Sequence, residues 1–333
     1  KTYTEPTVID GVAIASEDEN SKLWDSYMNS LTWEELVKLF TDGDGGKDGP
    51  VQFGGTCWQS TPIAAATWNI ELLEEQGKMY GNQALLVGLF SWRGPGTNIH
   101  RSPFNGRTFE YYSEDGVLSG KFASAEVNGA AQWGVYAFIK HFAANDQETN
   151  RCAFLLTYMS EQNLRENVLK PFEIVVKNFD YDHYVLGMMT SYNWLGTVPV
   201  ISNRDLLTDV LRGEWGFVGT VISDYNGSYG YQLSDAAVRA GNDLMLGYGM
   251  AESNKFEDTG AATLVLAMRQ ACKNILYTVG NSGYYVDPTA IVEEGVDNMT
   301  RLFTTINVSV CAAAAVIELA VVVRWLLKKK KAA

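Results

Sequence analysis

Short apolar runs alternate with helix-like stretches along most of this chain, and this alternation limits its fold more than any other sequence feature. Runs with the length of buried parallel strands occupy 85–92, 135–142, 184–191, 217–223 and 243–247. Between them, apolar residues recur at helical spacing in 21–40 and 260–279, and Ser160 and Asn203 stand where helix N-caps are expected. Buried strands that alternate with helices over roughly 250 residues predict the α/β class, as a TIM-type (β/α)8 barrel, regular or irregular.

The glycine-rich stretch 41–50 raises the question of a competing α/β fold. A doubly wound sheet would carry a GxGxxG phosphate loop between a strand and a helix, and this stretch neither follows a strand nor has that pattern. Nucleic acid is disfavoured as a partner because the net charge is −13, whereas a phosphate backbone must be met by basic residues. Three histidines, and four cysteines without a CxxC pair, give no metal-ligand pattern, so no cofactor is expected.

Polar side chains stand where several of the predicted strands end. Lys140 and His141 close one run, Tyr192 follows another, and Asp224 follows a third. The carboxyl ends of the strands of a parallel barrel meet at one mouth, where the active sites of such barrels lie. Any one of these residues can also serve as a structural cap at a strand end, but together they predict an active site at the mouth.

Four longer sequence blocks make the prediction more specific. They are GPGTNIHRSPFNGRTFEYYSEDGVLSG (94–120), IKHFAANDQETNR (139–151), LTDVLRGEWGF (207–217) and VISDYNG (221–227), with DGP at 48–50 and AATWN at 65–69 before them. In order and spacing these blocks resemble the signature of glycoside hydrolase family 3, in its β-glucosidase-like branch, from about residue 21 to residue 250. The resemblance implies the catalytic barrel of a retaining β-glycosidase, which forms a covalent glycosyl-enzyme.

The resemblance also implies a role for each matching residue. Asp224 corresponds to the nucleophile, and Asp48 to an aspartate that accepts hydrogen bonds from the outer hydroxyls of the bound sugar. The other matching positions hold the sugar or line its pocket, and they are Arg107, Lys140, His141, Arg151, Met189, Tyr192 and Tyr225, the last where many members have Trp. Cations near Asp224 are expected to keep the pKa of its carboxyl low. Flat surfaces for a sugar ring, or else core packing, are expected from Trp92, Trp194, Tyr225 and Tyr229.

One part of the family's machinery has no counterpart in the sequence. Double displacement needs a general acid/base carboxyl about 5–5.5 Å from the nucleophile, and in the β-glucosidase branch it comes from an α/β sandwich domain. Glu110, Glu114 and Glu148 lie in motifs that the family uses structurally. The N-acetylglucosaminide branch carries a histidine in the loop after KHF, where this chain reads AANDQETNR. We therefore expect a missing N-terminal α/β sandwich domain, as in a circularly permuted member of which this chain is the C-terminal part.

The stretch 306–327 has the length and apolar composition of a helix that crosses a bilayer. Glu318 and Arg324 interrupt it, at a cost of about 2.5–3.5 kcal/mol for a charge at the centre of a spanning helix, so a buried amphipathic helix or an artificial lysine tail on a core helix is the alternative. The lysines after it would lie in the cytoplasm, which places the catalytic domain on the extracellular side of the cell membrane. The expected organisation is an irregular segment 1–20, a barrel 21–280, a linker 281–305, a transmembrane helix 306–327 and a basic tail 328–333.

These features together predict an enzyme that releases a terminal β-linked sugar, glucose first of all, from oligosaccharides or glycosides. Release from chain ends follows from the resemblance, because a pocket that binds the outer hydroxyls of a sugar leaves no room beyond it. The alternative is a sugar-binding barrel without catalysis, anchored in a membrane, because a barrel without its acid would react poorly.

Overall fold

The computed structural model describes residues 22–41, 55–152, 154–225, 232–247, 255–256 and 258–283. The chain divides into two compact units, Lys1–Val286 and Asp287–Ala333, and all the described residues belong to the first. The predicted segments 1–20 and 306–327 therefore lie outside the described residues, as do Asp48 and Tyr229. Among the helices of the described ranges, none is long and apolar enough to cross a membrane.

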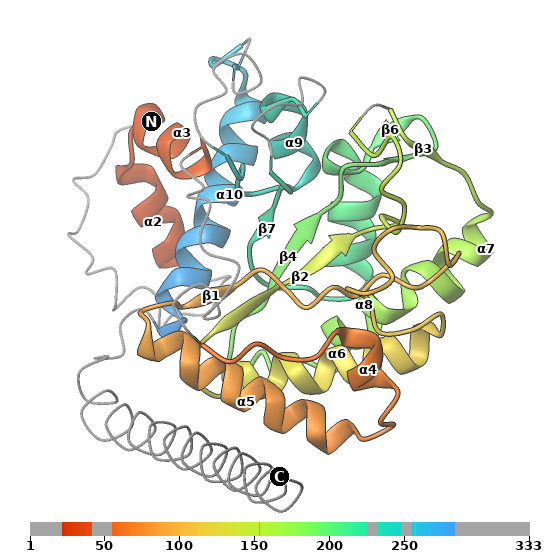
Figure 1. Ribbon diagram of the computed structural model, residues 1–333. Helices are drawn as coiled ribbons and strands as arrows, with labels where there is room; N and C mark the ends of the chain where they lie inside the picture. Colours follow the sequence, from red (N-terminus) through yellow and green to blue (C-terminus); the bar gives the residue numbers. More distant parts are fainter. Residues whose placement is uncertain are drawn as a thin grey trace, which may run out of the picture. The chain divides into compact units, whose positions relative to one another are not determined.

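Parallel strands form the central sheet of the first unit (Figure 1). Their order is β1 (Ser91–Trp92), β2 (Tyr136–Phe142), β4 (Gly187–Thr190) and β7 (Val221–Ile222). A parallel bridge from Ile222 to Leu244 continues the sheet into the fifth predicted run. Sheet order thus follows chain order, as a barrel-type fold requires. Only the end of the first predicted run, 85–92, is a strand. Residues 85–86 are the end of a helix, which stops near Gly88, a residue in the left-handed conformation at φ +73°.

Helices follow the strands and pack against the sheet and one another. α5 (Ile70–Leu86) lies along α6 (Gly116–Ala131), and their backbones approach so closely that a Cβ on Gly129 would lie 2.3 Å from the carbonyl oxygen of Glu74. α6 also packs on α8 (Lys170–Lys177), and α10 (Ala262–Gly280) packs on α9 (Ser234–Ala240). The shorter helical segments are α4 (Thr61–Ala65), α7 (Glu161–Asn163), the π-helical η2 (Leu164–Val168) and η4 (Asp205–Glu214), and the 3-10 turn η3 (Val200–Ser202).

Side-chain caps account for where several helices begin. The Ser160 hydroxyl accepts from the Asn163 N–H at 3.2 Å, and Asn203 Oδ1 accepts from the Leu206 N–H at 3.1 Å, which confirms both predicted N-caps. The single helix predicted over 21–40 is wrong in one respect, since it is two helices, α2 (Lys22–Ser30) and α3 (Trp33–Thr41).

The break between α2 and α3 is a capping box. Thr32 Oγ1 accepts from the Glu35 N–H at 3.2 Å, while Glu35 Oε2 accepts from the Thr32 N–H at 2.8 Å. These two reciprocal hydrogen bonds start a new helix at this point, although the apolar spacing runs through it.

A second, smaller sheet lies beside the carboxyl ends of the main strands. It contains β3 (Leu156–Thr157), β5 (Trp194–Leu195) and β6 (Val198–Pro199), in that order. β3 pairs with β5 in parallel, so the chain after Arg151 runs alongside the chain after Tyr192. This pairing holds two loops of the predicted mouth side by side.

Candidate active site

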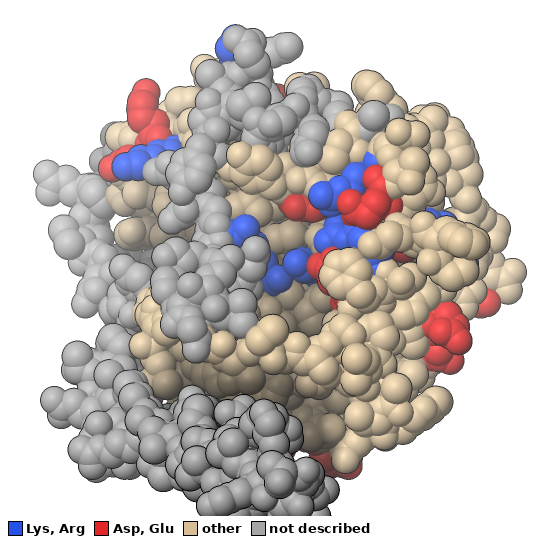
Figure 2. Space-filling view, viewed as in Figure 1, with Lys and Arg blue, Asp and Glu red and all other residues tan. Residues whose placement is uncertain are grey.

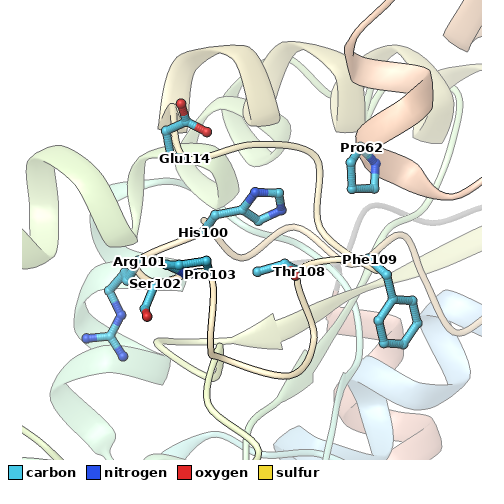
Figure 3. Close-up of a pocket in the computed structure, with 8 residues that line it drawn as sticks. All are labelled: Pro62, His100, Arg101, Ser102, Pro103, Thr108, Phe109 and Glu114. Carbon is cyan, nitrogen blue, oxygen red and sulfur yellow. The ribbon is translucent and has the colours of Figure 1, made fainter.

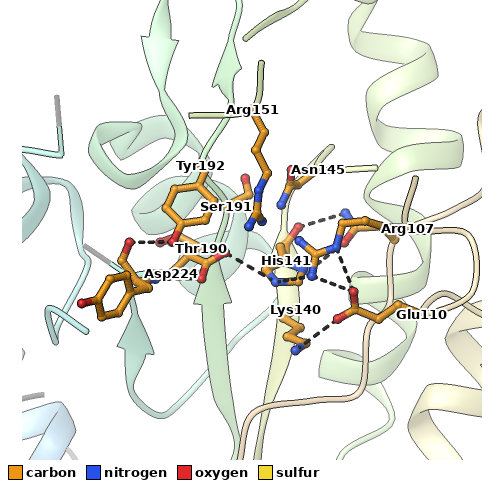
Figure 4. Close-up of polar contacts among 12 residues, drawn as sticks. Arg107, Glu110, Lys140, His141, Asn145, Arg151, Thr190, Ser191, Tyr192 and Asp224 are labelled. Atoms are coloured by element: carbon orange, nitrogen blue, oxygen red, sulfur yellow. Dashed lines mark hydrogen bonds and ion pairs between the residues drawn. The ribbon is translucent and has the colours of Figure 1, made fainter. Parts of the chain in front are cut away.

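The polar residues predicted at three strand ends come together at one place (Figure 4). His141 stands near the end of β2, Tyr192 follows β4, and Asp224 follows β7. His141 Nε2 lies 3.5 Å from Asp224 Oδ2, and the Tyr192 hydroxyl donates to the main-chain oxygen of Tyr225 at 2.6 Å. The parallel order of the strands therefore assembles the site that the sequence pattern predicts.

Asp224 has one occupied and one unoccupied carboxylate oxygen. Oδ1 accepts from the Tyr225 N–H at 2.7 Å, whereas Oδ2 is buried and has no hydrogen-bond partner among the described residues. The side chain is only 14% exposed. Burial raises the pKa of Asp224, and the Tyr225 N–H and the cations Arg151, Lys140 and Arg107 only partly oppose it. The expectation that cations hold this pKa low is thus wrong in sign, because burial outweighs them.

His141 is a neutral imidazole in this arrangement. Burial lowers its pKa well below the ordinary value, and Arg107, Lys140 and Arg151 lower it further. The Tyr111 hydroxyl donates to the Asn145 main-chain oxygen at 2.8 Å, so its own oxygen accepts from His141 Nδ1, at 3.3 Å. The proton therefore sits on Nδ1, and Nε2 accepts from Arg107 Nη2 at 3.3 Å.

Two carboxylates hold the predicted sugar-binding cations. Glu110 accepts from Arg107 Nε and Nη2 at 2.8 and 2.6 Å and pairs with Lys140 Nζ at 3.1 Å. Glu148 bridges Arg107 Nε at 3.3 Å and Arg151 Nε at 3.2 Å. Burial raises the pKa of Glu110, but Lys140 and Arg107 together bring it below its ordinary value, so Glu110 is ionised. Sequence reasoning gave both glutamates a structural role without naming their partners.

A buried polar frame fixes the backbone around His141. The Asn98 side chain donates to the His141 carbonyl at 2.9 Å and accepts from its N–H at 2.7 Å. Asp146 accepts from Arg101 Nε at 2.8 Å and from the Asn105 amide. These residues belong to the matched sequence blocks, yet nothing in their spacing distinguishes them from surface polar residues.

The remaining predicted residues differ in their surroundings. The Arg151 guanidinium carbon lies 4.8 Å from the centre of the Tyr192 ring, which is cation–π distance. Met189 is buried in a cluster with Phe138, Ile222 and Leu246. Tyr225 is 47% exposed, as a surface for a ligand requires.

Trp92 and Trp194, which were also predicted to offer flat surfaces to a sugar or to pack in the core, each contact another aromatic ring. Trp92 is buried against Tyr80, with ring centres 4.2 Å apart, which makes it a core residue. Trp194 contacts Phe154, at 5.5 Å between ring centres. Asp48 and Tyr229, the other predicted contacts, lie outside the described residues.

On the surface, Lys and Arg atoms gather with Asp and Glu atoms in a hollow of the face shown in Figure 2. A neighbouring pocket of about 570 Å³ is lined by Pro62, His100, Arg101, Ser102, Pro103, Thr108, Phe109 and Glu114 (Figure 3). Glu114 belongs to this pocket, whose described lining does not include Asp224. Among the described residues, no group of three or more His, Cys, Asp or Glu side chains is placed to hold a metal ion.

The parallel sheet, its covering helices and a polar site at the carboxyl ends of the strands define a TIM-barrel-type fold. Comparison with known proteins agrees. Residues 36–255 match the family described as glycosyl hydrolase family 3 N terminal domain, and the chain belongs to this family. The structure is similar to that of beta-glucosidase 3B from Thermotoga neapolitana in complex with glucose, with a TM-score of 0.69 and 31% identity over 84% of this chain and 45% of that one.

Curated relatives give the same family. Beta-glucosidase B of Emericella nidulans is 35% identical over 303 residues, which cover 82% of this chain and 35% of that protein. A beta-glucosidase of Rhizobium radiobacter is 42% identical over 208 residues, or 61% of this chain and 24% of that protein. The chain thus spans about a third or less of the length of these relatives.

Proposed function

We propose that this chain is the barrel part of a retaining glycoside hydrolase that releases a terminal β-linked sugar, with glucose as the sugar and Asp224 as the nucleophile. The observation that carries the proposal is the buried Asp224 Oδ2, which has no hydrogen-bond partner among the described residues and is under the electrostatic influence of Arg151, Lys140 and Arg107. The choice of glucose is supported by relatives named beta-glucosidases and by a similar structure that contains glucose.

The chemistry expected of this site is double displacement. In the first step Asp224 Oδ2 forms a bond to the anomeric carbon, while the bond from that carbon to the leaving oxygen breaks and a general acid gives that oxygen a proton. In the second step water attacks the same carbon and releases Asp224, and the proton of that water passes to the conjugate base of the acid.

No carboxyl group among the described residues of the site is identified as the general acid. Among the described carboxylates beside the predicted cations, Glu110 and Glu148 are both engaged in ion pairs. Glu110 is ionised and has no proton to donate. We propose that the acid comes from a further domain of a longer protein, an N-terminal α/β sandwich in a circularly permuted order. The length of the relatives, well beyond this chain, supports the existence of a further domain, whereas its kind and its position in the chain rest on the sequence resemblance.

The experiment that tests the function uses an aryl glucoside with a good leaving group, which needs little acid help. The chain should release the phenolate slowly, and Asp224→Asn should abolish the release, because the amide cannot form the glycosyl ester. The alternative function, a sugar-binding barrel without catalysis, is favoured by the ion-paired state of Glu110 and Glu148. Glucose binding without any phenolate release would establish that alternative instead.

A membrane location is a separate proposal that rests on the sequence of 306–327 and the lysines after it. We propose that this stretch anchors the chain with the barrel outside the cell. The full chain should float with phosphatidylcholine vesicles in a density gradient, whereas a chain truncated after residue 305 should stay at the bottom. Equal sedimentation of both would contradict the anchor without affecting the proposed chemistry.

A further inference from the structure

Within the part of the chain that the structure describes, three side chains around His141 have buried polar atoms that lack both a hydrogen bond and a cation closer than 3.5 Å. They are Asp224, through Oδ2, Arg107, through Nη1, and Asn145, through both its amide oxygen and its amide nitrogen. Glu148 Oε1 also lacks a hydrogen bond, but it lies 3.3 Å from Arg107 Nε in an ion pair. Figure 4 shows all three side chains gathered in one group with His141 and Arg151. Buried polar atoms nearly always have partners, since each orphaned one costs about 1–3 kcal/mol. A group of such atoms at one place therefore indicates a ligand that supplies the partners.

The sequence resemblance gives a role to Asp224 and to Arg107 but none to Asn145. This asparagine is fully buried, at 0% exposure, and neither of its amide atoms has a hydrogen-bond partner among the described residues. A structural asparagine in a core normally satisfies its own amide, as Asn98 does by donating to and accepting from His141. Asn145 is a different case.

The backbone on both sides of Asn145 is held firmly. Its carbonyl accepts from the Tyr111 hydroxyl at 2.8 Å, and the next residue, Asp146, is bound by Arg101. The residue before it, Ala144, takes φ +64°, a left-handed conformation that a residue with a Cβ rarely adopts. Such conformations persist where the surroundings enforce them, and they cluster at functional sites. The backbone thus holds the Asn145 amide in a fixed position, although the amide has no hydrogen-bond partner among the described residues.

The chemistry of the unpaired atoms points to hydroxyl groups. Arg107 Nη1 can only donate, Asp224 Oδ2 as a carboxylate can only accept, and the amide of Asn145 can do both. A hydroxyl also both donates and accepts, so a ring that carries several hydroxyls satisfies this set. A carboxylate or phosphate ligand could accept a hydrogen bond from Asn145 Nδ2–H. Its negative charge would, however, be repelled by the Asp224 carboxylate.

We propose that Asn145 binds a ring hydroxyl of the sugar directly, through its amide, and so helps to set sugar specificity. This inference rests on the proposed function, because the ligand is the sugar that Asp224 attacks. Asp224 and Arg107, the other two members of the group, are charged, whereas the Asn145 amide is neutral and would make a directional hydrogen bond to a single hydroxyl. Its contribution to binding would therefore depend on whether the sugar carries that hydroxyl.

The test compares wild type with Asn145→Ala and Asn145→Ser on an activated aryl β-glucoside and on its 2-, 3-, 4- and 6-deoxy analogues. Asn145→Ala should lower kcat/KM for the parent glucoside by about three- to tenfold, as expected for the loss of a hydrogen bond between two neutral groups. For one deoxy analogue the change should be about twofold or less, because that substrate lacks the hydroxyl that Asn145 would bind. Asn145→Ser, which keeps a donor and an acceptor, should lose less than Asn145→Ala on the parent.

The matched control is Asn128→Ala. Asn128 lies in α6 and also has a buried amide oxygen without a partner, but it is not among the residues of the site. This variant should leave the pattern over the five substrates unchanged. Asn145→Leu, an apolar side chain of similar size, should match Asn145→Ala in the ratio of parent to deoxy substrates, because it also lacks the hydrogen-bonding amide.

The same substitutions can be followed by binding if the chain proves silent in turnover. Calorimetric titration with glucose and the four deoxyglucoses should show weaker binding of glucose to Asn145→Ala and an unchanged affinity for one analogue. A uniform loss over all the sugars would overturn the proposal in favour of a structural role, and no loss in Asn145→Leu would overturn it because leucine cannot form the proposed hydrogen bond. Failure of wild-type turnover with this binding pattern intact would reject the proposed catalysis alone.

Discussion

His141 Nε2 lies 3.5 Å from Asp224 Oδ2 across the ends of β2 and β7, and both side chains are almost fully buried. Because burial and three cations keep the imidazole neutral, this contact is not an ion pair at neutral pH. A neutral His141 does not balance the negative charge of Asp224. Arg151, Lys140 and Arg107 are the cations that balance it.

Arg151 is the first of the side-chain cations that lower the pKa of Asp224, while burial raises that pKa more strongly. Replacing Arg151 by Gln removes a lowering charge, so the pKa of Asp224 should rise further. The acidic limb of the pH profile of kcat/KM should move to higher pH by about one unit, because the nucleophile is active only when ionised. Arg151→Lys keeps the charge and should move the limb much less. A limb that stays in place in Arg151→Gln would show that another group controls it.

Glu110 joins Arg107 and Lys140, and its loss should affect both activity and stability. Glu110→Gln leaves Lys140 without this carboxylate and leaves Arg107 paired with Glu148 alone, so the free energy of unfolding should fall by about 1–3 kcal/mol. KM for an aryl glucoside should rise at least about tenfold, because the cations lose their fixed positions. Thermal melting and steady-state kinetics measure the two effects.

The control for this variant is Glu173→Gln. Glu173 also joins two cations, Lys170 at 2.5 Å and Lys177 at 2.7 Å, but it does so on α8. It should change KM less than about twofold, the size expected of a substitution outside the site. An equal rise of KM in both variants would mean that Glu110 acts through general stability and not through the site.

Glu126 should make the stability of the barrel unit depend on pH. It is buried, and burial raises its pKa to about 7 despite hydrogen bonds from Tyr112 and Gln76. Since this folded-state pKa lies above the ordinary value of 4.5, the stabilising contribution is complete below pH 4.5 and is lost as the pH rises to about 7. In wild type the free energy of unfolding should therefore fall by about 3 kcal/mol between these two pH values, and in Glu126→Gln this fall should be absent.

Urea unfolding of wild type and Glu126→Gln at pH 5 and pH 8 measures this difference. The variant should gain stability relative to wild type at the higher pH. A difference that is the same at both pH values would show that Glu126 does not titrate in this range.

Gly129 should be irreplaceable at the contact of α5 and α6. A Cβ there would lie 2.3 Å from the Glu74 carbonyl oxygen, so Gly129→Ala should force the helices apart and cost about 1–3 kcal/mol. Gly213, in η4, has only Thr208 O within 4 Å of such a Cβ, at 3.4 Å, so Gly213→Ala should be stabilising by about 0.5–1 kcal/mol. Melting temperatures that fall equally in both variants would contradict the close approach of α5 and α6.

Much of the fold could be predicted from the sequence, because apolar runs and helix caps are local signals. The five runs appear in chain order in one parallel sheet, and the caps at Ser160 and Asn203 form as expected. The split of 21–40 was missed because apolar periodicity continues across the capping box of Thr32 and Glu35. β3 and β5 were missed because strands of two residues leave no periodic pattern.

The candidate site was predictable in its members but not in its energetics. Strand-end positions and matching blocks located His141, Tyr192 and Asp224, since parallel strands bring such positions together. The sign of the pKa shift of Asp224 depends on burial, which the sequence does not show. Asn145 was overlooked for a related reason, because an unpaired amide is visible only when every possible partner has a position.

The central claim is that Asp224 Oδ2 attacks the anomeric carbon, and trapping of the covalent intermediate tests it most directly. The chain is treated with a 2-deoxy-2-fluoro-glucoside that carries a good leaving group, and the modified peptide is sequenced by mass spectrometry. The account predicts one fluoroglucosyl group, carried by the peptide that contains Asp224, and none in Asp224→Asn. A label on another residue, or the same label in Asp224→Asn, would contradict it.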